Sequence, residues 1–79
     1  MAQVLLFGRL ADQAGWRDRA FEATSLAALR DLIAHDDPDL GEALSGPGVQ
    51  VAVDKALVRG EAVLATGTEV AFLPPMSGG

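Results

Sequence analysis

Short apolar runs separated by polar turns predict a sheet of four to five strands. The expected strands cover residues 3–8, 17–23, 49–53, 56–58 and 69–73. Their short length and their glycine, proline or acidic boundaries are typical of strands rather than helices. In the run 49–53, alternation places Val49, Val51 and Val53 on one face. Asp54-Lys55 and Gly67 suit turns before the strands that follow them.

A single main helix is predicted between the second and third strands. Three apolar residues recur there at helical spacing: Leu26, Leu29 and Ile33. Ser25 precedes them as a candidate N-cap, and Pro38 disfavours helical geometry at the residue before it. We therefore expect the helix to begin after Ser25 and to end near Asp36-Asp37. Residues 39–44 are expected to add one short turn of helix, and residues 9–16 are expected to form a polar loop that turns at Gly15.

The order of these elements is strand, strand, helix, strand, short strand, strand. One helix packed across one face of a mixed sheet covers its apolar side, which defines a two-layer α+β domain. We expect this domain to span residues 1–73 and an extended tail to span residues 74–79.

Composition narrows the classes of function. The chain has 79 residues, a formal net charge of −5 and no cysteine. The absence of cysteine excludes disulfides and thiolate metal sites, and the net negative charge argues against a nucleic-acid partner. No apolar run is long enough to cross a bilayer and no signal peptide is apparent, so a cytoplasmic protein without membrane contact is expected. The acidity fits either protein partners with basic surfaces or simple solubility.

Side chains with the usual catalytic chemistry are sparse. His35 is the single histidine and has no partner histidine or cysteine with which to hold a metal. The acids Asp36, Asp37 and Asp39 lack the ligand spacing of a calcium loop, and no phosphate-binding loop is present. We therefore expect no cofactor, no metal and no self-sufficient enzyme.

The residues after the last predicted strand carry the most informative pattern. Residues 74–79 read PPMSGG. Pro74 and Pro75 cannot continue a ladder and favour extended chain, whereas Gly78 and Gly79 have no side chain and can enter a narrow channel. Six extended residues reach at most about 20 Å, enough to carry a terminal carboxylate into a partner's active site. Because a carboxylate is a poor electrophile, it must first be activated, for example by a partner that adenylates it with ATP.

The sequence resembles the MoaD-type proteins, the small subunits of molybdopterin synthase. Residues 69–79 (EVAFLPPMSGG) resemble the ending of that family. Residues 51–54, 4–7 and 25–30 resemble its third strand and turn, its first strand and the start of its helix. The resemblance implies the β-grasp, or ubiquitin-like, fold. Asp54, where the family often has Asn, and the turn at residues 66–69 depart from the family pattern without touching the tail.

The resemblance also implies a cycle and its partners. An E1-like enzyme would adenylate Gly79, and a sulfur donor would convert it to a thiocarboxylate. The tail would then enter the large synthase subunit, in a heterotetramer, and deliver sulfur to cyclic pyranopterin monophosphate to form molybdopterin. Gly78 and Gly79 would carry the chemistry. Partner contacts would come from exposed apolar residues and the rest of the tail: Phe7, Leu57, Leu73, Pro74, Pro75, Met76 and Ser77.

Three other functions remain open at the level of sequence. The first is a sulfur carrier for thiamine or another product, against which the two prolines count because thiamine-pathway carriers usually lack them. The second is a ubiquitin-like modifier that is joined through Gly79 to lysines of target proteins. The third is a binding module with an inert tail. Separately, Phe7 and Leu57 could serve in ordinary core packing instead of partner binding. Removing Gly79 separates the binding module, which keeps its function, from a carrier, which loses it.

Overall fold

The polypeptide folds as a mixed sheet with three helices, and the computed structural model describes residues 1–75. The elements follow in this order: β1 (Ala2–Leu6), α1 (Gly8–Ala14), β2 (Asp18–Phe21), α2 (Leu26–Asp36), α3 (Pro38–Leu44), β3 (Gln50–Val53), β4 (Ala56–Val58) and β5 (Glu69–Leu73). All five predicted strands are present, and the first two pair with each other antiparallel.

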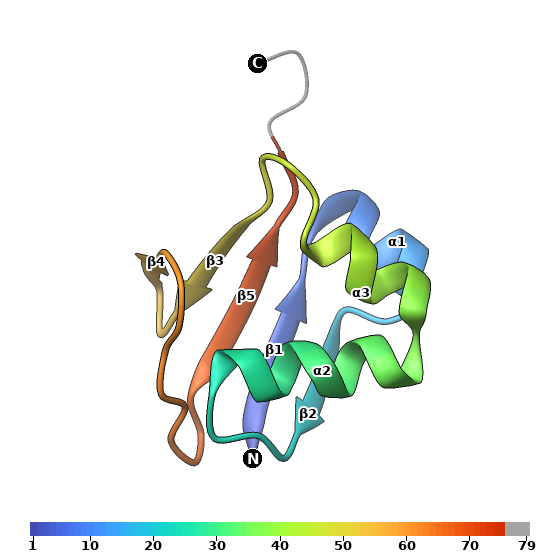
Figure 1. Cartoon of the computed structure of the whole chain (residues 1–79). Helices are drawn as coiled ribbons and strands as arrows, with labels where there is room; N and C mark the ends of the chain where they lie inside the picture. The colour runs from blue at the N-terminus through green and yellow to red at the C-terminus, as the bar shows by residue number, and fades with distance from the viewer. Residues whose placement is uncertain (76–79) are drawn as a thin grey trace.

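The five strands lie in the order β2-β1-β5-β3-β4, so the last strand of the chain occupies the centre of the sheet (Figure 1). β5 runs parallel to β1 and antiparallel to β3, with Val4 beside Val70 and Val51 beside Phe72. The outer pairs, β1 with β2 and β3 with β4, are antiparallel. Because β5 bonds to a neighbour on each side, the point where it ends is held by two strands.

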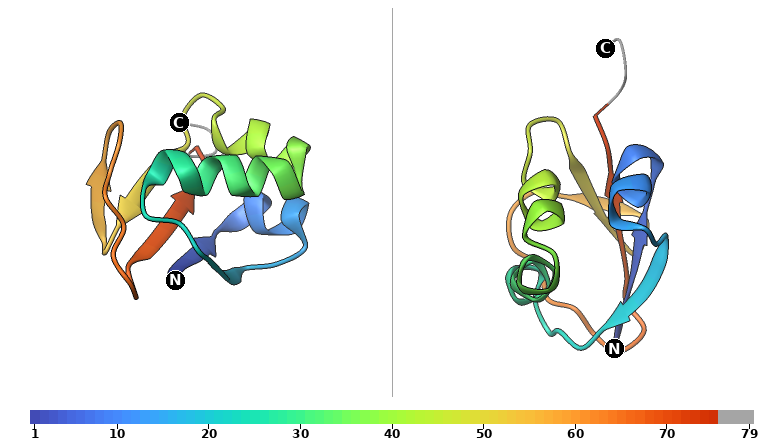
Figure 2. Two further views of the ribbon diagram at one scale, coloured as in Figure 1. Left: turned by 60° about the horizontal axis from the view of Figure 1, so that its bottom comes forward. Right: turned by 90° about the vertical axis from the view of Figure 1, so that its right-hand side faces the viewer.

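The hydrophobic core lies between the sheet and the helices. α2 and α3 lie on one side of the sheet, and α1 packs against α3 and β5 (Figure 2). The largest fully buried side chains come from both layers: Val4, Leu6, Leu29, Ile33, Leu40, Leu44, Val70 and Phe72. Within residues 1–75, α2 and α3 cover only this one face of the central strands.

The first and last residues of α2 agree with the bounds predicted from the sequence. The Ser25 hydroxyl accepts a hydrogen bond from the Ala28 amide at 3.1 Å, which satisfies a free donor of the first turn. α2 ends at Asp36, before Pro38. A second cap comes from the loop after β4, where the Glu61 carboxylate accepts from the Ala27 amide at 3.1 Å. This second cap joins distant parts of the chain.

The expectation of a loop at residues 9–16 was wrong, because residues 8–14 form α1. Leu10 and Ala11 are buried in the core and hold this turn of chain against α3. Gly15 does mark the turn, as the left-handed C-cap whose amide donates to the Ala11 carbonyl. A seven-residue segment with only two apolar side chains facing inward gives too weak a periodicity to recognise.

The acids after α2 have structural roles that their sequence left unexplained. Asp37 is the N-cap of α3, with its carboxylate accepting from the Leu40 amide at 3.1 Å, and Pro38 takes the first helical position. α3 is accordingly a seven-residue helix rather than a single turn. Asp36 pairs with Arg19 of β2 at 2.9 Å. The metal-binding alternative gains no support from these contacts.

Candidate functional site

The candidate site is the end of β5, where the chain leaves the sheet. In Figure 1, β5 ends beside the α3–β3 loop, at the end of the sheet opposite the N-terminus. Leu73 is the last residue of the strand and lies beside Gln50 of β3. Pro74 and Pro75 follow it, and both are half-buried. The expected end of the ladder at the two prolines is therefore confirmed.

The start of α1 and the α3–β3 loop approach the prolines at this exit. Gly8 is the first residue of α1, two residues after the end of β1, and a Cβ placed on it would be 3.1 Å from Pro74 Cγ. Gly48 lies in the α3–β3 loop, and a Cβ placed on it would be 2.7 Å from Pro75 Cβ. Each glycine thus lies so close to a proline that a side chain on the glycine would crowd the proline ring.

The open face of the sheet carries apolar residues toward this exit. Along β5, alternation places Ala71 and Leu73 on the face opposite the buried Val70 and Phe72. Ala71 is registered with Ala52 of β3, and Ala52 with Leu57 of β4, which places the three on the same face. Leu57 is 63% exposed.

Phe7 borders the same end of the sheet. It follows β1 directly and is 42% exposed, while Leu73 is half-buried. The core-packing alternative is therefore wrong for Phe7 and Leu57. Phe7 and Leu57 are exposed, Leu73 is half-buried and Ala71 is buried between its neighbours; these four apolar residues are here named the open-face patch. A patch of this kind is typical of a protein-binding surface.

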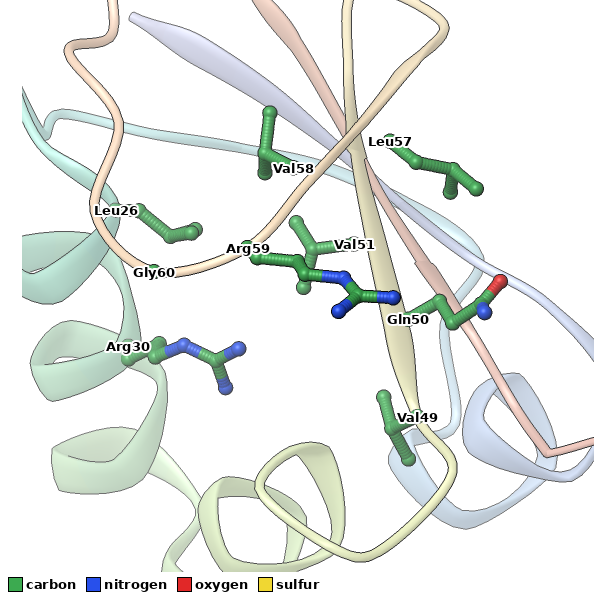
Figure 3. Close-up of a pocket in the computed structure, with 9 residues that line it drawn as sticks. All are labelled: Leu26, Arg30, Val49, Gln50, Val51, Leu57, Val58, Arg59 and Gly60. Atoms are coloured by element: carbon green, nitrogen blue, oxygen red, sulfur yellow. The ribbon is translucent and has the colours of Figure 1, made fainter.

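A cavity of about 300 Å³ lies beside β3, between α2 and the segment that follows β4, and Leu57 is among the residues that line it (Figure 3). Figure 3 shows Leu57 and Gln50 on one side of β3 and Leu26 and Arg30 on the other. The lining includes two guanidinium groups, those of Arg30 and Arg59. Arg30 donates to the Leu44 carbonyl at 3.2 Å and lies over the Phe72 ring, so it ties α2 to the end of α3. Its contacts indicate a structural role.

Glu61, in the segment after β4, has a perturbed carboxyl group. The pKa of Glu61 lies below its usual value of 4.5, because its carboxylate accepts from the backbone amides of Ala62 and Ala27. This group caps a helix at the far side of the molecule from the exit. Among residues 1–75, no cluster of metal-ligating side chains occurs and no helix is long and apolar enough to cross a membrane.

Four of the predicted site residues lie outside the described residues: Met76, Ser77, Gly78 and Gly79. The structure therefore locates the point from which the tail departs and the surfaces around that point. The roles of the four residues stay predictions from the sequence.

The comparisons with known proteins agree with this architecture. The fold is that of the ubiquitin-like β-grasp proteins, a mixed sheet with its final strand in the centre and α2 across one face. The profile of the ThiS family matches residues 4–79, and the chain belongs to this family. It is thus a small ubiquitin-like protein of the class that includes sulfur carriers and protein modifiers. Comparison with curated proteins found no match.

Three solved structures show the same fold at low sequence identity. SAMP1 from Haloferax volcanii is 24% identical, with a TM-score of 0.80 over 99% of this chain and 98% of its own. The small archaeal modifier protein 1 of Methanosarcina acetivorans is 19% identical, with a TM-score of 0.86 over 99% and 95%. CysO of Mycobacterium tuberculosis, described as an antigen, is 21% identical, with a TM-score of 0.79 over 96% and 100%.

The sequence predicts Phe7, Leu57, Leu73 and the prolines as site residues, but it gives no sign of the two glycines beside the prolines. Gly48 falls between predicted elements, and Gly8 falls at the end of the first predicted strand. A glycine at such a position in the sequence indicates only a turn. The partner of each glycine lies far along the chain, so only the folded structure brings the two together.

Proposed function

We propose that this protein is a sulfur carrier of molybdenum cofactor biosynthesis that works through its C-terminal Gly79. The Gly79 carboxylate attacks the α-phosphate of ATP on an E1-like partner, which forms an acyl adenylate and releases pyrophosphate. A sulfur donor then displaces AMP and leaves a thiocarboxylate. In the large subunit of molybdopterin synthase, the thiocarboxylate sulfur bonds to cyclic pyranopterin monophosphate, and water then hydrolyses the acyl–sulfur bond, which leaves the sulfur on the acceptor and returns Gly79 to a carboxylate.

One observation carries this proposal: a ThiS-family domain precedes a PPMSGG tail at the end of its central strand. The position of β5 supports it, because a strand bonded on both sides can present a tail without disturbing the core. The open-face patch supports it as well. The patch reaches the exit at Leu73, so a partner that binds it receives the tail in the same encounter.

The catalytic side chains of this cycle belong to the partners. We propose that the open-face patch, the prolines, Met76 and Ser77 bind the activating enzyme and the large subunit in turn, the latter in a heterotetramer. Gly78 and Gly79 enter the active sites. The carrier needs no cofactor of its own. Its role is to present an activated carboxylate and to bind the two partners in turn. A cytoplasmic location follows from these partners.

A second candidate is a protein modifier, because an adenylated Gly-Gly terminus can react with an amine as well as with sulfide. Small archaeal modifier proteins share the fold. A carrier for thiamine or another sulfur-containing product is the third, and it differs from the first only in the acceptor. Lysine adducts on cellular proteins identify the modifier, and the sulfurated product distinguishes the two carriers.

The first experiment is the mass of the intact protein after incubation with ATP, a sulfide source and its cognate activating enzyme. Replacement of one oxygen by sulfur adds nearly the mass of a methionine oxidation, so fragmentation must place the change on Gly79. A chain without Gly79 is the control and should gain no mass. Unmodified Gly79 in the presence of a demonstrably active partner would overturn the carrier proposal in favour of a binding module.

A further inference from the structure

The two glycines at the exit are constrained by more than the turns that contain them. Gly8 has φ +55° and Gly48 has φ +82°, in the left-handed region that other residues rarely adopt. Gly15, Gly60 and Gly67 also have positive φ, but a Cβ on any of these three would meet nothing within 4 Å. Gly8 and Gly48 therefore combine a turn with a close approach to a proline ring.

The two contacts come from separate parts of the fold. Gly8 continues from β1, the parallel neighbour of β5, and Gly48 precedes β3, the antiparallel neighbour. Pro74 is thus approached by the first residue of α1, which follows β1, and Pro75 by the loop that precedes β3. Proline has a fixed φ near −65° and a rigid ring, so ring contacts restrict the backbone direction directly.

We propose that Gly8 and Gly48 are positioning residues that, with Pro74 and Pro75, form a proline seat which sets the direction in which the tail leaves the domain. The inference rests on the proposed carrier function and deepens it. A tail aimed by the domain arrives at a partner's active site with part of its orientational freedom already removed, which raises the rate of the transfer step. The competing role of the two glycines is to permit tight turns and nothing else.

The chain offers a matched pair of variants that separates these roles. Gly48→Ala and Gly67→Ala place a methyl group at nearly the same backbone angle, φ +82° and +85°. Both carry the strain of a positive φ, but only the methyl at 48 would collide with Pro75, at 2.7 Å. Gly67 lies in the turn before β5, at the opposite end of that strand from the exit. Any difference between the variants beyond their shared strain reports the contact with the proline.

The direction of the tail can be measured without any partner. Because the chain has no cysteine, Ser77→Cys provides a single attachment point for a nitroxide label. Paramagnetic broadening of the domain amides then maps where the tail points in the wild-type background and in each glycine variant. We expect Gly48→Ala to change the broadening pattern and Gly67→Ala to leave it unchanged. An unchanged pattern in Gly48→Ala would overturn the seat.

The consequence for transfer is measured on unlabelled protein with the cognate activating enzyme. We expect kcat for Gly48→Ala to fall by about ten- to a hundredfold relative to Gly67→Ala, with KM changed by less than about twofold, because the docking surface is intact and only the aim is lost. Equal kcat values would show that the seat has no role in transfer and would overturn the inference.

Two further outcomes are distinguishable. If the wild-type protein is not activated at all, the proposed function fails, and the label experiment alone decides whether the seat exists. If Gly48→Ala does not fold, Gly8→Ala takes its place, since its methyl would approach Pro74 less closely, at 3.1 Å. Gly8→Ala is then compared with Gly67→Ala in both measurements and must show the same changes.

Discussion

Gly41 of α3 lies in backbone contact with Ala34 of α2. A Cβ placed on Gly41 would be 2.4 Å from Ala34 Cβ and 2.7 Å from its Cα. α2 and α3 are separated only by Asp37, so this contact sets how closely the two helices fold back on one another. It also explains why a glycine sits inside a helix, where it normally costs stability.

We expect Gly41→Ala to destabilise the protein by about 1–2 kcal/mol, because overpacking against a neighbouring backbone outweighs the better helix propensity of alanine. Denaturant unfolding should show a lower midpoint with an unchanged slope. The exposed residue next to it provides the control, since Glu42→Ala should change the free energy of unfolding little. A Gly41→Ala variant as stable as the control would contradict the packing argument.

The strands and α2 could be predicted from the sequence because each carries its own signal. Val51 and Val70 lie in short apolar runs with turn residues on both sides, and Ser25 is both a cap by composition and a cap in the structure. The same local reasoning failed for α1, because its two buried residues are explained only by their packing against α3. Propensity could not supply this contact, because it depends on tertiary packing.

The candidate site also has one part that the sequence predicts and another that only the folded structure shows. Phe7, Leu57 and the tail could be predicted through resemblance and through the chemistry of a slender terminus. The proline seat could not, because a glycine in a loop and a proline after a strand each suggest only local geometry. A close approach between residues 48 and 75 is a property of the sheet order, which places β3 beside β5.

Adjacent acids at the end of α2 should differ in their effect on stability. Asp37→Ala removes the N-cap of α3 and is expected to cost about 0.5–2 kcal/mol. Asp36→Ala breaks an ion pair with Arg19 whose side chains are 44% and 54% exposed, so it should cost less than about 1 kcal/mol. Side-by-side urea titrations at one salt concentration make the comparison, and the reverse order of stabilities would refute the capping assignment.

The lowered pKa of Glu61 predicts a pH dependence of stability. Folding favours its charged form through the amides of Ala62 and Ala27, so the stabilisation is present above the usual pKa of 4.5 and is lost as the pH falls through the lower folded value. Glu61→Gln should therefore flatten the rise in the free energy of unfolding with pH in this acidic window. Glu42→Gln, at an exposed position on α3, controls for the loss of one carboxylate. Identical pH profiles for the two variants would rule out the second cap of α2.

The open-face patch should matter for binding and little for stability. Leu57→Ser alters a side chain that is 63% exposed and should change the free energy of unfolding by less than about 0.5 kcal/mol. If the patch contacts the activating enzyme, the same change should weaken binding by about 1–2 kcal/mol in calorimetry. Val63→Ser is the matched control, because Val63 is 86% exposed and lies in the segment between β4 and β5. Equal affinities for the two variants would move the interface away from Leu57.

Gly79→Ala tests the requirement for a terminus without a side chain. The substitution changes none of the described residues 1–75, so unfolding should be unchanged, whereas a methyl group beside the reacting carboxyl should obstruct a channel that admits only backbone. Adenylation and transfer should both slow, by about tenfold or more if the reacting atoms are displaced by 1 Å. Single-turnover formation of the thiocarboxylate measures the first step, and appearance of the sulfurated acceptor measures the second. A normal rate in both steps would eliminate the steric explanation for the terminal glycine, while a loss in the second alone would place the narrow channel in the acceptor enzyme.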